Sequence, residues 1–212
     1  MESIIYLIRH GETVWNRIGR LQGHLDAPLT HAGLDQAHAI GRDLKARLGG
    51  NGPAMTPAMT ASPLGRTRQT AAIIAEHLGI GFDDITLDER LMEITLGDHD
   101  GYAGWDAIDR DHPDLAAERR RDPWNFRHPN GESSQMVQDR VRPVLEHLSA
   151  TPGIHVVVAH GVLNKVFRGL YLGLSREQTF ALDRPQNAYF RLTGGTEARI
   201  EVEVDATVST GI

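Results

Sequence analysis

Two segments of the chain place a histidine next to a glycine at the end of an apolar run. The run Ile4–Ile8 ends in Arg9-His10-Gly11, and the run Ile154–Ala159 ends in His160-Gly161. Ligands of α/β proteins bind at the carboxyl ends of the strands. A guanidinium holds a phosphate by two parallel hydrogen bonds, and an imidazole serves as nucleophile, base or metal ligand. The two segments therefore predict phosphate chemistry at a sheet edge.

Further charged groups occur where neighbouring strands are expected to end. Ser62–Thr70 places Arg66 at a strand–helix junction, where the helix N-terminus adds free amide donors and partial positive charge. Glu93 opens a glycine-bearing loop after the next expected strand. Imidazoles, guanidiniums and one carboxylate are then expected to converge, a set that suits a phosphoryl group whose charge spreads over its oxygens.

The elements that position these groups alternate along the chain. Periodic apolar positions predict helices over Thr30–Leu48, Ser62–Leu78, Glu132–Leu148 and Leu163–Leu172. Apolar runs predict strands at Ile4–Ile8, up to Ala61, near Ile85–Leu87, at Ile154–Ala159, and near Asn187–Leu192 and Arg199–Val204. This alternation predicts an α/β three-layer sandwich, with a mostly parallel central sheet, helices on both faces and one antiparallel edge strand.

Length and composition set broad limits. The 212 residues are expected to form one domain over 1–204 with a flexible tail at 205–212, and the polar segment 92–131 is expected to form a lid or substrate-specificity region. The chain has no cysteine, so disulfides and cysteine nucleophiles are excluded. A net charge of -6 argues against non-specific nucleic-acid binding. Because an apolar signal region and a membrane-length stretch are lacking, we expect a cytoplasmic protein without membrane partners, either a monomer or a homodimer.

The chain resembles the histidine phosphatase superfamily, also called phosphoglycerate mutase-like, from Ile4 to about Asn187. The resemblance is carried by Arg9-His10-Gly11-Glu12-Thr13 with Trp15-Asn16, Gln22-Gly23, Asp26 with Pro28-Leu29-Thr30, Ser62-Pro63-Leu64 with Arg66 and Gln69-Thr70-Ala71, Leu91 with Glu93 and Gly97, Gly131-Glu132-Ser133, and Ala159-His160-Gly161. Each motif alone is weak, and their shared order along the chain gives the resemblance its weight.

The resemblance implies a role for each matching residue. His10 matches the nucleophile that becomes a phosphohistidine, and Glu93 matches the proposed general acid. The residues that match the family's clamp on the phosphoryl oxygens are Arg9, Arg66 and His160. Expected substrate-binding positions are Asn16, Gln22, Gly23, Ser62 and Gly161. The implied substrate is a small phosphate ester, with a sugar phosphate or phosphoglycerate as the default.

Several positions leave alternatives open. Asp98-His99-Asp100-Gly101 replaces an aromatic-Glu-Gly run common in the family, which makes Asp100 a second carboxylate candidate. Arg119-Arg120-Arg121 either reaches a second acidic group on the substrate or forms a solvated face, and Arg168 is expected to face solvent. His10, His160 and Glu93 could form a zinc site, but the adjacent arginines would repel a dication, so no metal is expected.

Three functions are compatible with these residues. A phosphomonoesterase would transfer the phosphoryl group from His10 to water and need no cofactor. A phosphoglycerate mutase would use the same phosphohistidine with 2,3-bisphosphoglycerate. Mutases of that kind carry a long basic insertion after the acid loop, whereas only a short segment separates Gly101 from Asn130 here, so the phosphatase is favoured. A non-catalytic scaffold is disfavoured because such relatives tend to lose the nucleophile or the acid.

Overall fold

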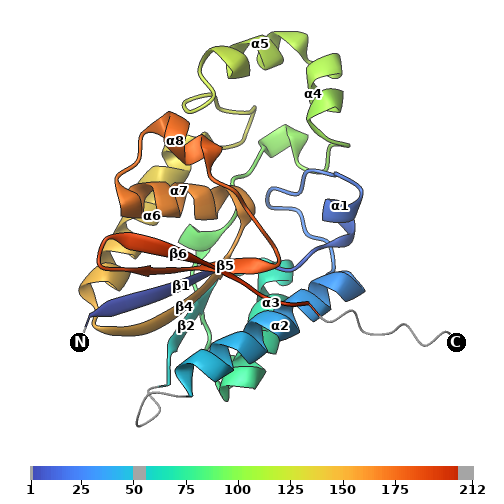
Figure 1. Ribbon diagram of the computed structural model, residues 1–212. Helices are drawn as coiled ribbons and strands as arrows, with labels where there is room; N and C mark the ends of the chain where they lie inside the picture. The colour runs from blue at the N-terminus through green and yellow to red at the C-terminus, as the bar shows by residue number, and fades with distance from the viewer. Residues whose placement is uncertain (1, 50–55, 205–212) are drawn as a thin grey trace, which may run out of the picture.

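A six-stranded sheet forms the centre of the protein (Figure 1), whose computed structural model describes residues 2–49 and 56–204. The strands are β1 (Ser3–Arg9), β2 (Ala58–Ala61), β3 (Thr86–Leu87), β4 (Gly153–Ala159), β5 (Ala188–Thr193) and β6 (Thr196–Glu201), in the order β3-β2-β4-β1-β5-β6. β1, β2, β3 and β4 pair in parallel, and β5 runs antiparallel to both β1 and β6. The mostly parallel sheet with antiparallel pairing toward one edge is confirmed.

Helices cover both faces of the sheet (Figure 1). The long helices are α2 (His31–Leu48), α3 (Gly65–Leu78), α6 (Ser134–Ala150) and α7 (Gly161–Leu172). Alternate residues of β1 point to opposite faces, so Tyr6 and Ile8 pack with α2 and α3, whereas Ile5 and Leu7 pack with α6 and α7. The α/β sandwich predicted from the sequence is therefore confirmed, with one apolar core on each side of the sheet.

Several helix boundaries follow from capping chemistry. The Thr30 hydroxyl accepts the Gly33 amide at the start of α2, as its side chain predicts. The expected start of α3 at Ser62-Pro63 was wrong by a few residues, because Leu64 is the N-cap and Pro63 remains outside the helix. Four shorter helices, α1 (Val14–Arg17), α4 (Trp105–Asp111), α5 (Pro113–Arg121) and α8 (Arg176–Ala181), complete the fold.

The segment 92–131 extends beyond the carboxyl edge of the sheet and carries α4 and α5 (Figure 1). Its polar sequence forms short helices linked by turns, as expected from the absence of a long apolar period. The expected tail 205–212 lies outside the described residues. No helix in 2–49 or 56–204 is long and apolar enough to span a bilayer.

Two buried histidines anchor the α4–α5 segment to the loop before α6. The Nδ1 atoms of His99 and His128 lie 2.9 Å apart, and the His112 ring centroid lies 4.8 Å from that of His99. Burial lowers the pKa of His99, assisted by the charge of His112 and opposed by Asp98. Burial, His99 and Arg119 lower the pKa of His128 to about 4. This contact therefore requires neutral rings.

We expect acidification to weaken the fold through this pair. Above the unfolded pKa of about 6.5 both histidines are neutral in the folded and in the unfolded chain. Between about pH 6.5 and 4 the unfolded chain binds protons that the folded chain excludes, and the lowered pKa of His128, reduced for screening by solvent, corresponds to a loss of about 2 kcal/mol of stability. Urea unfolding at pH 7, 6, 5 and 4 measures this loss. His128→Phe should flatten the pH dependence, and exposed His31→Phe should leave it unchanged; equal slopes in all three proteins would contradict the assignment.

Candidate active site

The carboxyl ends of the two central parallel strands bring the two glycine-linked histidines together. β1 and β4 pair Arg9 with Ala159, and the His10 amide donates to the Ala159 carbonyl at 3.1 Å. The rings of His10 and His160 then lie with their centroids 5.3 Å apart, at 62° to one another. Both side chains are buried. The juxtaposition expected from the two apolar runs is therefore present.

The local contacts of His10 define which nitrogen is available. Its Nδ1 lies 2.8 Å from the Gly11 carbonyl oxygen, which can only accept a hydrogen bond, so the neutral ring carries its proton on Nδ1. Nε2 then keeps a lone pair. Burial, reinforced by the charges of Arg9 and Arg66, lowers the pKa of His10 well below its usual range. The ring is therefore neutral at physiological pH and suited to nucleophilic attack.

Arg66 enters the site from the first turn of α3 and is held by the loop that follows α1. Nη1 donates to the Leu25 carbonyl at 2.8 Å and to the Asp26 carboxylate at 3.1 Å, while Nη2 donates to the Gly23 carbonyl at 2.8 Å. Burial lowers the pKa of Arg66, and the nearby Glu93 and Asp26 oppose this effect. The guanidinium is thus a rigid, desolvated cation.

Several buried nitrogens at the site have no hydrogen-bond partner. Arg9 donates through Nη1 to the Arg184 carbonyl at 2.6 Å, but its Nε is unpaired. Arg66 Nε and His160 Nδ1 are also buried without partners. Burial, together with the charge of Arg184, lowers the pKa of Arg9 to about 10, so Arg9 remains charged at neutral pH. Since an arginine nitrogen can only donate, these groups favour an oxyanion.

Glu93 lies opposite these cations at the start of α7. Its Oε1 accepts the Leu163 amide at 3.1 Å and the Ile94 amide at 3.0 Å, and its Oε2 accepts the Val162 amide at 3.1 Å. Amides at the N-terminus of a helix are free to bind a carboxylate, which explains this position. Three backbone donors therefore orient the only carboxylate among the residues that line the adjoining cavity.

A cavity of about 420 Å³ opens over these residues. Arg9, Arg66 and His10 line it together with Glu93, and His160 lies fully buried beside His10. Two further arginines, Arg20 and Arg184, also line it, as does Gln186. The Gln186 amide donates to the His10 carbonyl and to Asn16 Oδ1, both at 3.1 Å. Sequence reasoning missed Arg20, Arg184 and Gln186. The only signals were the polar loop after α1 for Arg20 and the polar stretch before β5 for Arg184 and Gln186.

The other predicted substrate-binding residues lie around this cavity in different ways. Asn16, Gln22 and Gly23 line it, and the Gln22 amide donates to the Thr13 hydroxyl. The Ser62 hydroxyl is buried 2.8 Å from His160 Nε2, so it contacts the second histidine. Gly161 packs against Arg9, where an added Cβ would lie 3.4 Å from Nε. The structure therefore brings all ten predicted residues to one end of the sheet.

A family model described as the histidine phosphatase superfamily (branch 1) matches residues 5–204. The chain belongs to this superfamily. The match confirms the resemblance that the separate motifs carry, and it extends beyond Asn187 to include β5 and β6.

The relatives of this chain carry the names of both mutases and phosphatases. The protein named "Probable phosphoglycerate mutase GpmB" from Citrobacter koseri is 35% identical over 181 residues, covering 80% of this chain and 75% of that one. The structure of a mycobacterial glucosyl-3-phosphoglycerate phosphatase in complex with VO3 is 27% identical, with a TM-score of 0.73 over 95% of this chain and 98% of that one. The α-ribazole phosphatase of Shigella flexneri, 21% identical, shares the fold with a TM-score of 0.76 over 95% and 96% of the two chains. An enzyme of the phosphatase or mutase class is supported.

Asp100 stabilises the loop beside the site. Its Oδ1 accepts the Leu96 amide at 2.8 Å, and its Oδ2 accepts the His24 amide at 3.0 Å and the Thr95 hydroxyl at 2.9 Å. These contacts indicate a structural role rather than that of a second acid. Within 2–49 and 56–204 no three His, Asp or Glu side chains gather in a way that could hold a metal ion.

Gly23 couples this loop to the Arg66 cation. It has a φ of +50°, its carbonyl accepts Arg66 Nη2, and an added Cβ would lie 1.7 Å from Asp100 Oδ1. Because Asp100 is held by three donors, Gly23→Ala should displace the carbonyl and the guanidinium. We expect kcat/KM for p-nitrophenyl phosphate to fall about 100-fold, as for a displacement of about 1 Å in an active site.

The control for this prediction is Gly79→Ala. Gly79 ends α3 with a φ of +71° and has open space around its Cα, so the variant carries the backbone strain without the clash. Its kcat/KM should remain within about threefold of wild type, since strain of this kind costs only about 1 kcal/mol of stability. Equal losses in both variants would show that strain alone explains the effect.

Proposed function

We propose that this member of the superfamily is a phosphomonoesterase that forms a covalent phosphohistidine at His10. The observation that carries the proposal is the neutral His10 ring, with Nε2 free, among buried guanidinium nitrogens that lack partners. An arrangement of this kind suits a tetrahedral anion that is attacked in line by an imidazole. The VO3 bound by the mycobacterial relative is consistent with an oxyanion site in this fold.

In the first step, His10 Nε2 forms a bond to phosphorus while the phosphorus–oxygen bond to the alcohol breaks. Glu93, carrying a proton at this step, transfers it to the departing oxygen. In the second step water attacks phosphorus, the phosphorus–nitrogen bond breaks, and the Glu93 carboxylate accepts the proton of the water. Inorganic phosphate and the alcohol are the products, and Glu93 regains its proton.

The remaining groups stabilise the charge of the transferred phosphoryl group. Arg9 and Arg66 provide fixed cations in a buried environment, where their interaction with the anion is stronger than in water. His160 is expected to support the same oxygens from beside His10, oriented by the Ser62 hydroxyl. The cavity wall formed by the loop around α1 includes Asn16, Gln22 and Gly23. Gln186 donates to the His10 carbonyl and thereby holds the backbone of the nucleophile in place.

Phosphoglycerate mutase activity is the second candidate, and the name of the Citrobacter koseri relative favours it. A mutase would return the phosphoryl group from His10 to a bound phosphoglycerate, with 2,3-bisphosphoglycerate as cofactor. Arg20 and Arg184 line the cavity and could bind the carboxylate of phosphoglycerate. The short segment between Gly101 and Asn130 still favours hydrolysis, because mutases that use the bisphosphate carry a long basic insertion at this point.

The deciding experiment measures both activities in EDTA. We expect the protein to release phosphate from p-nitrophenyl phosphate and from 3-phosphoglycerate, without stimulation by 2,3-bisphosphoglycerate. Isomerisation to 2-phosphoglycerate that is stimulated by the bisphosphate and exceeds phosphate release would identify a mutase. A folded protein that turns over none of these esters would indicate a non-catalytic relative.

A further inference from the structure

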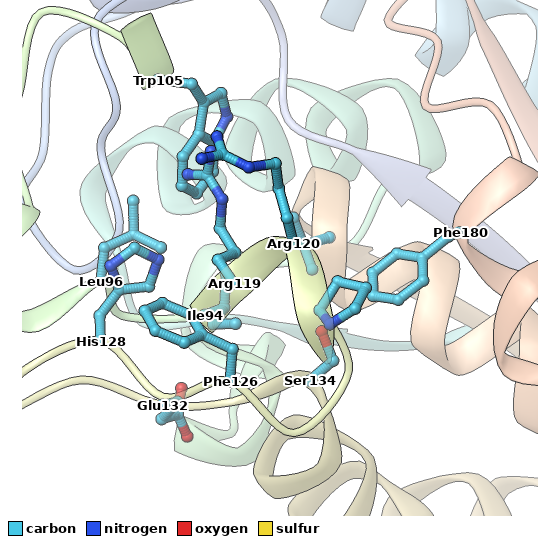
Figure 2. Close-up of a pocket in the computed structure, with 12 residues that line it drawn as sticks. Ile94, Leu96, Trp105, Arg119, Arg120, Phe126, His128, Glu132, Ser134 and Phe180 are labelled. Carbon is cyan, nitrogen blue, oxygen red and sulfur yellow. The ribbon is translucent and has the colours of Figure 1, made fainter. Parts of the chain in front are cut away.

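A second cavity of about 420 Å³ adjoins the phosphate site (Figure 2). It lies among the α4–α5 segment, the loop before α6 and the first turn of α7, with α8 on its far side. Its walls are mostly apolar, in contrast to the arginine-rich walls of the phosphate site. We call it the annex. The phosphoryl transfer proposed at His10 does not require the annex.

The annex is continuous with the phosphate site through shared residues. Ile94, Leu96, Trp105 and Val162 line both cavities. Ile94 follows Glu93 directly, and the Val162 amide binds Glu93 Oε2. A departing oxygen protonated by Glu93 would therefore be placed at the junction of the two cavities. The carbon skeleton attached to that oxygen would then extend into the annex.

Aromatic side chains form much of the annex wall. Phe126 meets the His128 ring at a centroid distance of 4.9 Å, and Trp105 meets the same ring at 5.6 Å. In Figure 2 Phe180 lies on the opposite side from His128. Trp105 and Phe180 are each 38% exposed although they are large and apolar. An uncovered apolar surface inside a concave site is typical of a ligand pocket.

The charged groups in the annex are paired with partners in the protein. Arg119 donates to Asp109 at 2.7 Å and lies over the Trp105 ring at 4.3 Å, and Glu132 pairs with Arg140 at 2.8 Å. One donor, Arg119 Nη1, is buried without a partner and leaves room for a single acceptor oxygen. Of the three consecutive arginines, Arg119 and Arg120 line the annex, and both contact Asp109, which offsets part of their charge.

We propose that the annex binds the leaving group of the substrate and that this group is an aromatic or similarly broad apolar alcohol. The proposal rests on the phosphomonoesterase function and names its substrate class. It replaces the sugar phosphate expected by default, because a polyhydroxylated leaving group would face apolar walls that cannot satisfy its hydroxyls. An aromatic ring of naphthalene size would instead stack among Trp105, Phe126 and Phe180.

The test compares two phosphonates that the enzyme cannot hydrolyse. 2-Naphthylmethylphosphonate carries an aromatic group, and 3,4-dihydroxybutylphosphonate carries a polar chain on the same head group. Calorimetry should give a dissociation constant at least about tenfold lower for the naphthyl compound, in keeping with the burial of one aromatic group. Equal affinities, or tighter binding of the dihydroxybutyl compound, would overturn the proposal.

Substitutions in the annex wall locate the effect. Phe126→Ser should weaken binding of the naphthyl compound about fivefold or more, on the scale of a lost apolar contact, and leave the dihydroxybutyl compound unchanged, which also verifies the fold. The matched control is Phe82→Ser, because Phe82 is 53% exposed and lies against Arg68, among residues that line neither cavity. Its affinities should equal those of wild type. Parallel weakening of both compounds in Phe126→Ser would contradict a role in leaving-group recognition.

The two proposals fail in different ways. Turnover of phosphate esters without any naphthyl preference would overturn the annex proposal and leave the phosphomonoesterase intact. A clear naphthyl preference in a protein that hydrolyses no ester would overturn the phosphomonoesterase, because the phosphonate measurement requires no chemistry.

Discussion

Replacing His10 with alanine is expected to lower kcat for every phosphate ester at least about 10⁴-fold, the scale on which enzymes lose activity with their nucleophile. The physical reason is that the second imidazole of the site is not placed to replace His10: His160 does not line the cavity, and its Nε2 lies 2.8 Å from the Ser62 hydroxyl. Water attacking directly would lack both the covalent intermediate and the positioning that His10 provides.

The intermediate can be detected independently of turnover. Wild-type protein mixed with ³²P-labelled ester and quenched within milliseconds should retain label that is stable to alkali and lost in acid, the behaviour of a phosphoramidate. His10→Ala and the bulkier His10→Asn should retain none. The control His31→Ala alters an exposed histidine on α2 and should label fully. Label in His10→Asn, or activity above about 1% of wild type, would contradict the nucleophilic role.

The central sheet and the histidine pair could be predicted because they depend on short-range patterns. Apolar runs such as Ile4–Ile8 form buried strands, and parallel strands share a carboxyl edge, so the residue that follows each run is placed by topology alone. Arg66 could be predicted for a similar reason, since a helix that follows a central strand must begin at that edge. The contacts of these residues are therefore largely a consequence of the fold class.

The annex and the outer wall of the site could not be predicted, because they depend on how distant polar segments pack. Arg184 and Gln186 reach the cavity only through the path of the chain before β5. Arg168 was expected to face solvent, and that expectation is wrong: the guanidinium is buried over the Phe190 ring at 3.5 Å and paired with Glu197 at 2.8 Å. Its helical position gave no indication of the acidic partner on β6.

The role of Asp100 could not be predicted from the sequence either. A carboxylate near a catalytic loop is compatible with acid catalysis or with bracing the backbone, and the residue type alone does not separate the two. Asp100 accepts three donors from His24, Thr95 and Leu96 and lines neither cavity, which favours bracing. Glu93 also accepts three backbone amides, yet it lines the cavity with the cations, so its predicted role must be tested by chemistry.

Glu93→Gln is expected to separate esters according to their leaving groups. For 2-phenylethyl phosphate, whose alkoxide is too basic to leave unprotonated, kcat/KM should fall about 100- to 10,000-fold, the contribution of a general acid. For p-nitrophenyl phosphate, whose phenolate leaves without a proton, kcat/KM should fall by less than about tenfold. The Gln oxygen keeps the Leu163 and Ile94 donors, whereas its nitrogen cannot accept the Val162 amide. Because that lost contact is the same for both esters, it should lower kcat/KM for both equally and leave their difference to proton transfer. Exposed Glu89→Gln is the control and should change neither ester.

Hydrolysis of the phosphohistidine allows a second measurement on the Glu93→Gln variant. Glu93 is also the base that activates water, so in Glu93→Gln the phosphohistidine formed from p-nitrophenyl phosphate should accumulate. Stopped-flow absorbance should then show a burst of nitrophenolate equal to the enzyme concentration, followed by a slow steady state that wild type lacks. A burst with nearly unchanged kcat/KM requires that His10 is phosphorylated normally and that only proton transfer has failed. Equal losses of kcat/KM on both esters, without a burst, would instead mean that Glu93 acts by orienting the first turn of α7.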